Sequence, residues 1–104
     1  MTTKTYSPAE VATRLQSELS AWRYDDGHLR RDLKTADWLA SMAVANRISD
    51  LAEASDHHPD LLIAWGRVQI SLATHDAGGI TNKDFALASA IESCLGGAAG
   101  TPAP

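Results

Sequence analysis

The chain has 104 residues, of which 44% are hydrophobic and 21% are charged, and its formal net charge is −4 at pH 7. These proportions are those of an ordinary globular domain and exclude a chain that is disordered throughout. The 9 lysines and arginines are scattered along the sequence, so the basic patch of a nucleic-acid-binding protein is missing and no nucleic-acid partner is expected.

Nothing in the sequence indicates export or a membrane partner. Residues 1–20 lack an apolar stretch of about 7 to 15 residues behind a basic start, and no later run approaches the roughly 18 apolar residues of a membrane span. Cys94 is the only cysteine, which excludes an internal disulfide and favours a reducing compartment. We therefore expect a cytoplasmic protein in which Cys94 fills part of a helix.

A first helix is predicted over residues 8–20. Ser7, Pro8 and Glu10 form the pattern of a helix start, because the serine hydroxyl can accept from the amide three residues on while the glutamate reaches back. The apolar residues expected to face the core are Val11, Leu15, Leu19 and Trp22.

A β-hairpin is predicted over residues 22–33. Asp26-Gly27 stands between two short stretches in which apolar residues alternate, which is typical of a tight turn between antiparallel strands. His28 follows this turn and is interpreted as a surface residue that belongs to no cluster.

A long helix of about five turns is predicted over residues 35–55, which contain neither glycine nor proline. Its apolar residues keep an irregular helical spacing and are Leu39, Met42, Ala43, Ile48, Leu51 and Ala52. Glu53 then falls in the last turn. Pro59 prevents continuation of the helix and favours extended backbone at His58.

Two further strands are predicted at residues 61–65 and 67–74, joined by a tight connection at Gly66. A glycine-containing loop over residues 75–80 precedes a helix over residues 81–95. This order favours an α+β two-layer sandwich, with a four-stranded, mostly antiparallel sheet and three helices packed on one face. Residues 1–95 would form this single domain, and residues 96–104 a flexible C-terminal tail.

Histidines are expected to gather at one rim of this sheet. His57 and His58 lie where the long helix passes into the third strand, and His75 lies where the fourth strand enters the glycine loop. Because the two strands pair through a short connection, these two ends lie on the same side of the sheet. Glu53 and Asp84 are candidates to reach the same rim.

Such a cluster favours proton-transfer chemistry. Histidine has an unperturbed pKa near about 6.5, and a carboxylate beside it fixes the tautomer. A metal site is the alternative interpretation. However, adjacent side chains on an extended backbone point in nearly opposite directions, so His57 and His58 are poorly placed to chelate one ion.

The spacing of Glu53, His57-His58-Pro59, Trp65, His75 and Asp84 resembles the signature of the pterin-4a-carbinolamine dehydratase family. The resemblance is strong over residues 51–92. It is weak over residues 1–50, where it is limited to Trp22 and the arrangement Leu29-x-Arg31-x-Leu33, in which the family often has phenylalanine in place of Leu33.

The resemblance implies a lyase, a 4a-hydroxytetrahydrobiopterin dehydratase that needs no metal or redox cofactor. Such an enzyme converts 4a-hydroxytetrahydropterin, a carbinolamine, to quinonoid dihydropterin and water. It thereby supports the recycling of tetrahydropterin after turnover of aromatic amino-acid hydroxylases. The expected partner is therefore the pterin substrate, within a hydroxylase pathway.

The resemblance also implies roles for individual residues. His57 and His75 would be the general acid and base, without an assignment of which donates the proton. The remaining residues would contact the pterin or support its pocket, and they are His58, Glu53, Asp84, Pro59 and Trp65.

Two of these residues also have purely structural interpretations. Asp84 stands three residues after Thr81, where an acidic side chain closes a helix-start capping box. Trp65 has the character of an aromatic residue on a half-buried strand.

The alternative function is a non-catalytic protein-binding or assembly module, because fold alone does not determine function. The presence of all three histidines at these intervals favours the enzyme. An exposed sheet edge, together with what is usual in the family, favours a homodimer or homotetramer.

Overall fold

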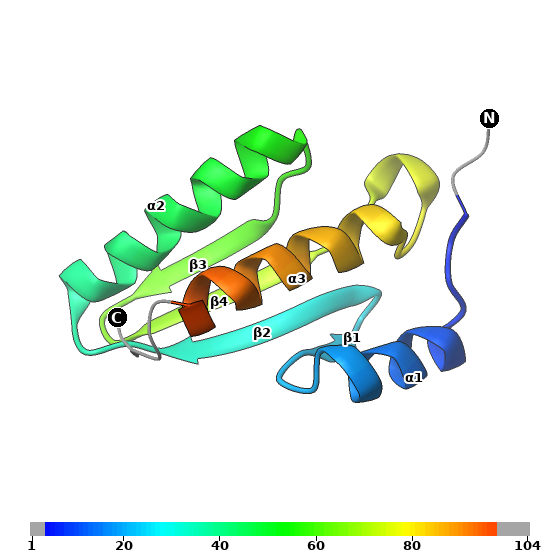
Figure 1. Cartoon of the computed structure of the whole chain (residues 1–104), viewed down its shortest axis with the longest axis horizontal. Helices are drawn as coiled ribbons and strands as arrows, with labels where there is room; N and C mark the ends of the chain where they lie inside the picture. The colour runs from blue at the N-terminus through cyan, green and yellow to red at the C-terminus, as the bar shows by residue number, and fades with distance from the viewer. Residues whose placement is uncertain (1–3, 98–104) are drawn as a thin grey trace.

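The structure is a computed structural model that describes residues 4–97 (Figure 1). Helices and strands follow one another in the order α1, β1, β2, α2, β3, β4, η1 and α3, where η1 is a single turn of 3₁₀ helix. Their bounds are α1 Pro8–Glu18, β1 Arg23–Asp25, β2 His28–Lys34, α2 Trp38–Ser55, β3 Asp60–Ala64, β4 Arg67–Leu72, η1 His75–Ala77 and α3 Asn82–Gly97.

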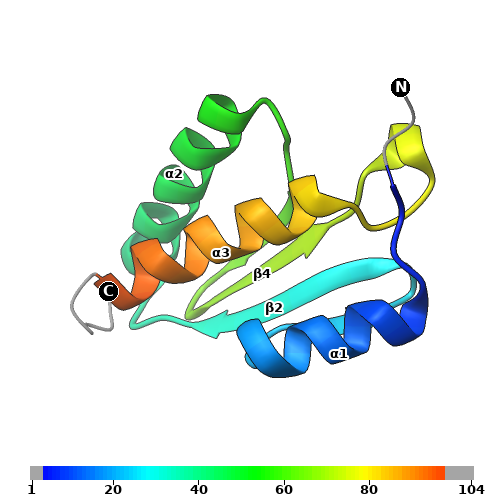
Figure 2. The same ribbon diagram turned by 45° about the vertical axis from the view of Figure 1, so that its right-hand side comes forward.

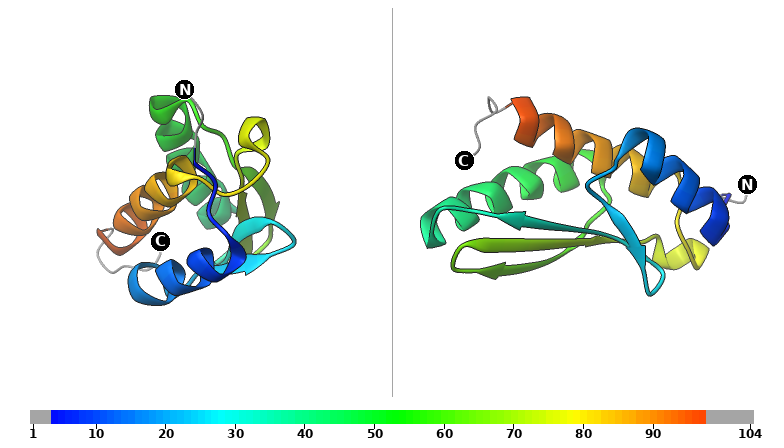
Figure 3. Two further views of the ribbon diagram at one scale, coloured as in Figure 1. Left: turned by 90° about the vertical axis from the view of Figure 1, so that its right-hand side faces the viewer. Right: turned by 90° about the horizontal axis from the view of Figure 1, so that it is seen from below.

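The four strands form one sheet in the order β1-β2-β4-β3, and every neighbouring pair is antiparallel. The three α-helices lie on one face of this sheet, with α3 between α1 and α2 (Figures 2 and 3). The predicted α+β two-layer fold is confirmed.

The register of the strands separates an apolar face from a polar face. Leu29 pairs with Leu72, and Leu61 pairs with Ile70, so these side chains point toward the helices and into the core. The alternate positions carry polar side chains on the open face, among them Arg30, Asp32, Gln69 and Ser71. This alternation explains why one face of the sheet is covered and the other is not.

The start of α1 has the predicted capping box. The Ser7 amide donates to Glu10 Oε1 at 2.8 Å, and the Glu10 amide donates to Ser7 Oγ at 3.1 Å. The helix ends at Glu18, slightly earlier than predicted. The predicted apolar stripe is confirmed, since all four of its residues are buried: Val11, Leu15, Leu19 and Trp22.

The start and the buried face of α2 differ from the prediction. The helix begins at Trp38 rather than at residue 35, because Asp37 caps it and accepts from the Ala40 amide at 2.9 Å. Leu39, one of the apolar residues of the predicted helical pattern, is 77% exposed. Ser41 is buried instead, because its hydroxyl donates to the Ala64 carbonyl at 2.8 Å and so turns this side of α2 toward the end of β3.

The remaining boundaries also shift by a few residues. β3 and β4 each end earlier than predicted, and Trp65-Gly66 forms the turn between them, with Gly66 at a φ of +76°. α3 includes Gly96 and Gly97, and residues 98–104 of the expected tail lie outside the described residues. No helix within the described part of the chain is long and apolar enough to cross a membrane.

Candidate active site

A buried carboxylate, that of Asp84, lies near the start of α3. Its side chain is fully buried, and its Oδ2 accepts from the Thr81 amide at 2.9 Å and from the Thr74 hydroxyl at 2.7 Å. The Thr81 bond is the backward half of the predicted capping box. Two further hydrogen bonds extend from the Thr74 hydroxyl. Thr81 Oγ1 lies 2.7 Å from Thr74 Oγ1, and the Lys83 amide donates to Thr81 Oγ1. The structural role expected of Asp84 is therefore present.

The second carboxylate oxygen of Asp84 forms a hydrogen bond with the ring of His57. His57 Nε2 lies 2.6 Å from Asp84 Oδ1, and only 12% of the histidine side chain is exposed. A carboxylate can only accept, so Nε2 carries the hydrogen in this pair. The Nδ1 atom of His57 is then the nitrogen left for proton exchange with a ligand. Asp84 thus joins the start of α3 to the segment that follows α2.

His58 points to a different partner from His57, as expected for adjacent residues on an extended backbone. Its Nε2 forms a hydrogen bond with Glu53 Oε2, across the end of α2. Both side chains are open to solvent, with 54% of His58 and 75% of Glu53 exposed. α2 ends at Ser55, and the cap residue Asp56, with a left-handed φ of +52°, turns the chain away from the helix before the two histidines. This exposed pair is available to a ligand.

His75 opens the η1 turn, directly after Thr74. The Thr74 amide donates to the Gly79 carbonyl at 3.1 Å, and Gly78 has a φ of +75°, which closes the loop tightly. His75 is exposed and borders a hollow of about 330 Å³ between this loop and the β1–β2 turn. Thr74 borders the same hollow and also contacts Asp84. A short series of contacts therefore connects this hollow to His57.

His28 belongs to this group, which the sequence analysis missed. The ring of His28 lies 6.4 Å from that of His75, centre to centre, with an interplanar angle of 67°. His28 is half-buried and borders the same hollow. The prediction of a free surface residue was wrong because the pattern of a hairpin gives its turn but not the loop against which that turn packs.

Pro59 and Trp65 lie at the two ends of β3. Pro59 is half-buried and directly precedes the strand, next to His58. Trp65 follows the strand at its far end and is 72% exposed. At about 3.3 Å per residue, the strand separates Trp65 from Pro59 by roughly 20 Å. Within one chain, the structure therefore does not bring Trp65 to the histidine rim, whereas the end of α2 and the end of β4 both lie at the opposite end of β3 from Trp65 (Figure 1).

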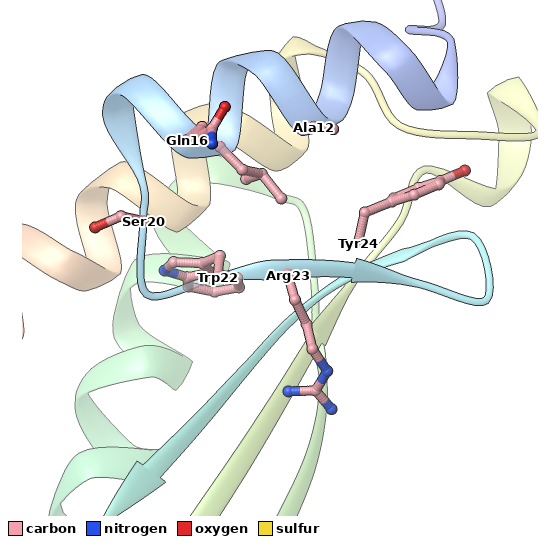
Figure 4. Close-up of a pocket in the computed structure, with 7 residues that line it drawn as sticks. Ala12, Gln16, Ser20, Trp22, Arg23 and Tyr24 are labelled. Carbon is pink, nitrogen blue, oxygen red and sulfur yellow. The ribbon is translucent and has the colours of Figure 1, made fainter.

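Another hollow, of about 430 Å³, lies between α1 and β1 and contains none of the predicted site residues (Figure 4). Gln16, Trp22 and Tyr24 are among the residues that line it. The Trp22 indole N–H is already bonded to Glu92 Oε2 at 2.9 Å. Across residues 4–97, no three His, Cys, Asp or Glu side chains converge in a group that could hold a metal ion.

The fold and this rim define a small two-layer α+β protein whose site combines histidines with carboxylates, the groups used to move protons near neutral pH. The sequence pattern of the family described as pterin 4 alpha carbinolamine dehydratase matches residues 4–94. The chain belongs to this family.

Bacterial relatives extend over almost the same part of the chain. A protein of Acidobacterium capsulatum is 42% identical over 86% of this chain and 96% of its own length. A protein of Thermosynechococcus vestitus is 45% identical over 82% of this chain and 88% of its own length. Both are named, provisionally, as pterin-4-alpha-carbinolamine dehydratases.

Two solved structures are similar in fold. The crystal structure of a transcriptional coactivator/pterin dehydratase from Brucella melitensis superposes with a TM-score of 0.79 at 27% identity, covering 86% of this chain and 97% of the other. A pterin dehydratase-like protein described as a RuBisCO assembly factor in the alpha-carboxysome superposes with a TM-score of 0.59, covering 70% of this chain and 87% of the other. At 18% identity, the second likeness shows the fold alone.

Proposed function

We propose that this protein dehydrates 4a-hydroxytetrahydropterin to quinonoid dihydropterin and water, with His57 and His75 as the acid–base pair. The observation that carries the proposal is the pairing of His57 with the buried carboxylate of Asp84, which is linked through Thr74 to the loop of His75. Family membership supports the class of reaction, and the geometry supports the choice of residues.

The reaction requires two proton transfers and involves neither oxidation nor reduction. One proton adds to the 4a-hydroxyl, the C4a–O bond breaks, and the oxygen leaves as water. The N5–H proton passes to a base, and the electron pair of that N–H bond forms the C4a=N5 double bond. Two positioned imidazoles can carry out both transfers near neutral pH, because each can give or accept a proton.

Asp84 has a defined part in this proposal, which is to position His57. A carboxylate bonded to one ring nitrogen fixes the tautomer and the orientation of the ring, and it stabilises the imidazolium that forms when the ring takes up a proton. Asp84 is buried behind His57, so it acts through this histidine rather than by touching the substrate. This differs from the expectation that Asp84 reaches the rim itself.

His58 and Glu53 are proposed to bind the pterin ring. Both are exposed, and because His58 Nε2 is bonded to Glu53 Oε2, His58 Nδ1 and Glu53 Oε1 remain as acceptors for the N–H donors on the polar edge of a pterin. Pro59 supports them indirectly by fixing the backbone that carries the histidines. Tetrahydrobiopterin as the parent cofactor, a cytoplasmic location, a role beside an aromatic amino-acid hydroxylase and a homo-oligomeric state belong to the same proposal.

The test is stopped-flow absorbance of 4a-hydroxytetrahydropterin, generated in place by a hydroxylase. We expect the wild-type protein to accelerate its decay, and the double variant His57→Ala, His75→Ala to return the decay to the spontaneous rate. Asp50→Ala is the matched control, because Asp50 is exposed on α2 and outside the rim. If the wild-type protein leaves the decay unchanged, the dehydratase proposal is wrong and a non-catalytic binding role takes its place.

A further inference from the structure

The β1–β2 turn carries His28 to the edge of the site. Asp26 and Gly27 have φ angles of +51° and +77°, the left-handed pair that makes a two-residue hairpin turn. The first residue of β2 is therefore His28, which faces the η1 loop across the hollow of about 330 Å³. Neither the proposed acid–base pair nor the exposed Glu53–His58 pair uses this side chain.

Among the residues that the structure describes, the side-chain hydrogen bonding of His28 uses only one ring nitrogen. Its Nδ1 lies 2.8 Å from the Asp26 carbonyl oxygen. A carbonyl oxygen can only accept, so Nδ1 carries the hydrogen, and in the neutral ring Nε2 is an unshared acceptor. The turn that places His28 thereby also fixes its tautomer.

The distance between His28 and His75 suits a shared ligand atom. Their ring centres are 6.4 Å apart. A direct hydrogen bond between two ring nitrogens would place the centres roughly 5 Å apart, whereas one atom hydrogen-bonded to a nitrogen of each ring at a bent angle places them roughly 6 to 7 Å apart. The separation therefore favours one polar atom held between the two imidazoles over a bond between them. The edge-on angle of 67° excludes a flat ligand stacked between parallel rings.

The walls of the hollow leave room for such a ligand. A Cβ atom placed on Gly27 or on Gly78 would meet no atom within 4 Å, so both glycines border open space. A volume of about 330 Å³ falls within the range of roughly 300 to 1,000 Å³ that is usual for small-molecule sites. His28 also borders an adjoining hollow on the open sheet face together with Asp60, the residue after Pro59. It thus stands between the η1 loop and the segment that follows His58.

We propose that His28 is a substrate-contacting residue, whose Nε2 joins the imidazole of His75 in holding one polar atom of the pterin. This inference rests on the proposed function, since it takes the pterin as the ligand. It adds the β1–β2 turn as a third segment of the site, beside the end of α2 and the η1 loop.

Two substitutions distinguish the roles of the two ring nitrogens of His28. His28→Asn keeps a donor near the Nδ1 position for the Asp26 carbonyl and removes the atom at the Nε2 position. His28→Gln keeps a polar atom near the Nε2 position. Loss of one hydrogen bond to the substrate is expected to raise KM roughly three- to tenfold in His28→Asn, while His28→Gln stays within about twofold of wild type. If His28 only stabilised the turn through its Nδ1 bond, His28→Asn would keep that bond, and KM would then change less in His28→Asn than in His28→Gln.

A second measurement does not depend on catalysis. The side-chain ¹⁵N resonances of the histidines are followed while 6-methylpterin is added to the wild-type protein. We expect the Nε2 resonance of His28 to move together with that of His75, and the dissociation constant to rise by the same factor in His28→Asn. An unmoved His28 resonance, or unchanged binding and KM in His28→Asn, overturns the inference even if wild type is an active dehydratase. Pterin binding at His28 by a protein that does not accelerate dehydration supports the inference and refutes the proposed activity.

Discussion

Replacing Asp84 with asparagine changes the electrostatics of the site while keeping its shape. The carboxylate accepts three hydrogen bonds, from the Thr81 amide, the Thr74 hydroxyl and His57 Nε2. An asparagine can serve the first two with its single oxygen. Its NH₂ group then faces His57 and donates to Nε2, which requires the hydrogen of His57 to move to Nδ1. Nδ1, the nitrogen proposed to exchange protons with the substrate, then already carries a hydrogen and cannot accept one.

The cost to folding of Asp84→Asn is expected to be modest. Two bonds weaken from charge-assisted to neutral, each by about 1 kcal/mol, so the free energy of unfolding should fall by about 2 kcal/mol. Asp84→Ala removes all three bonds and leaves the Thr81 amide without its partner, for which we expect a loss of about 3 to 4 kcal/mol. Urea unfolding measures both.

The cost to activity should be much larger than the cost to folding. Loss of the correct tautomer in a carboxylate–histidine pair lowers turnover by about 10⁴-fold in the best-studied hydrolase triad, and we expect a loss of at least about 10²-fold for Asp84→Asn. Stopped-flow decay of the carbinolamine gives the rate, and the ¹⁵N shifts of His57 report the tautomer. A folded Asp84→Asn protein with an unmoved tautomer and wild-type turnover would refute the reasoning.

Three further predictions concern single residues. Ser7→Ala removes the forward half of the α1 capping box and should lower the free energy of unfolding by about 1 kcal/mol in urea, and no change would mean that the cap is dispensable. The pKa of Asp32 is lowered, chiefly by its hydrogen bond with Arg23, so its contribution to stability is present above its ordinary value of 3.8 and is lost as pH falls through the lower folded value. Asp32→Asn should therefore flatten the fall of the urea midpoint at acidic pH, and an unchanged slope counts against this ion pair. Trp65→Ala should leave carbinolamine turnover unchanged because Trp65 lies at the far end of β3, and a large loss would return it to the site.

The sequence predicts those parts of the fold that depend on neighbouring residues. The capping box at Ser7 and the hairpin at Asp26-Gly27 are local patterns, and both are present. The start of α2 was misplaced because a stretch without glycine or proline does not by itself mark where a helix begins, whereas the Asp37 cap does. Only packing against Ala64, 23 residues away from Ser41, decides which side of α2 is buried.

The same limit applies to the site. The carboxylate that positions His57 lies 27 residues away in the sequence. Spacing indicated that it could reach the rim, but not that it sits behind the histidine. His28 was missed for a related reason, since the hollow that it shares with His75 exists only where two loops pack together.

The double duty of Asp84 affects how other sequences of this fold should be interpreted. Its Oδ2 belongs to the start of α3 and its Oδ1 belongs to His57. A lineage that had abandoned catalysis would still gain stability from an aspartate at this position, so its presence is poor evidence of activity. His58 and His75 have no comparable role in folding, since both are exposed. Loss of these two side chains, rather than of Asp84, would mark the relatives that have become binding proteins.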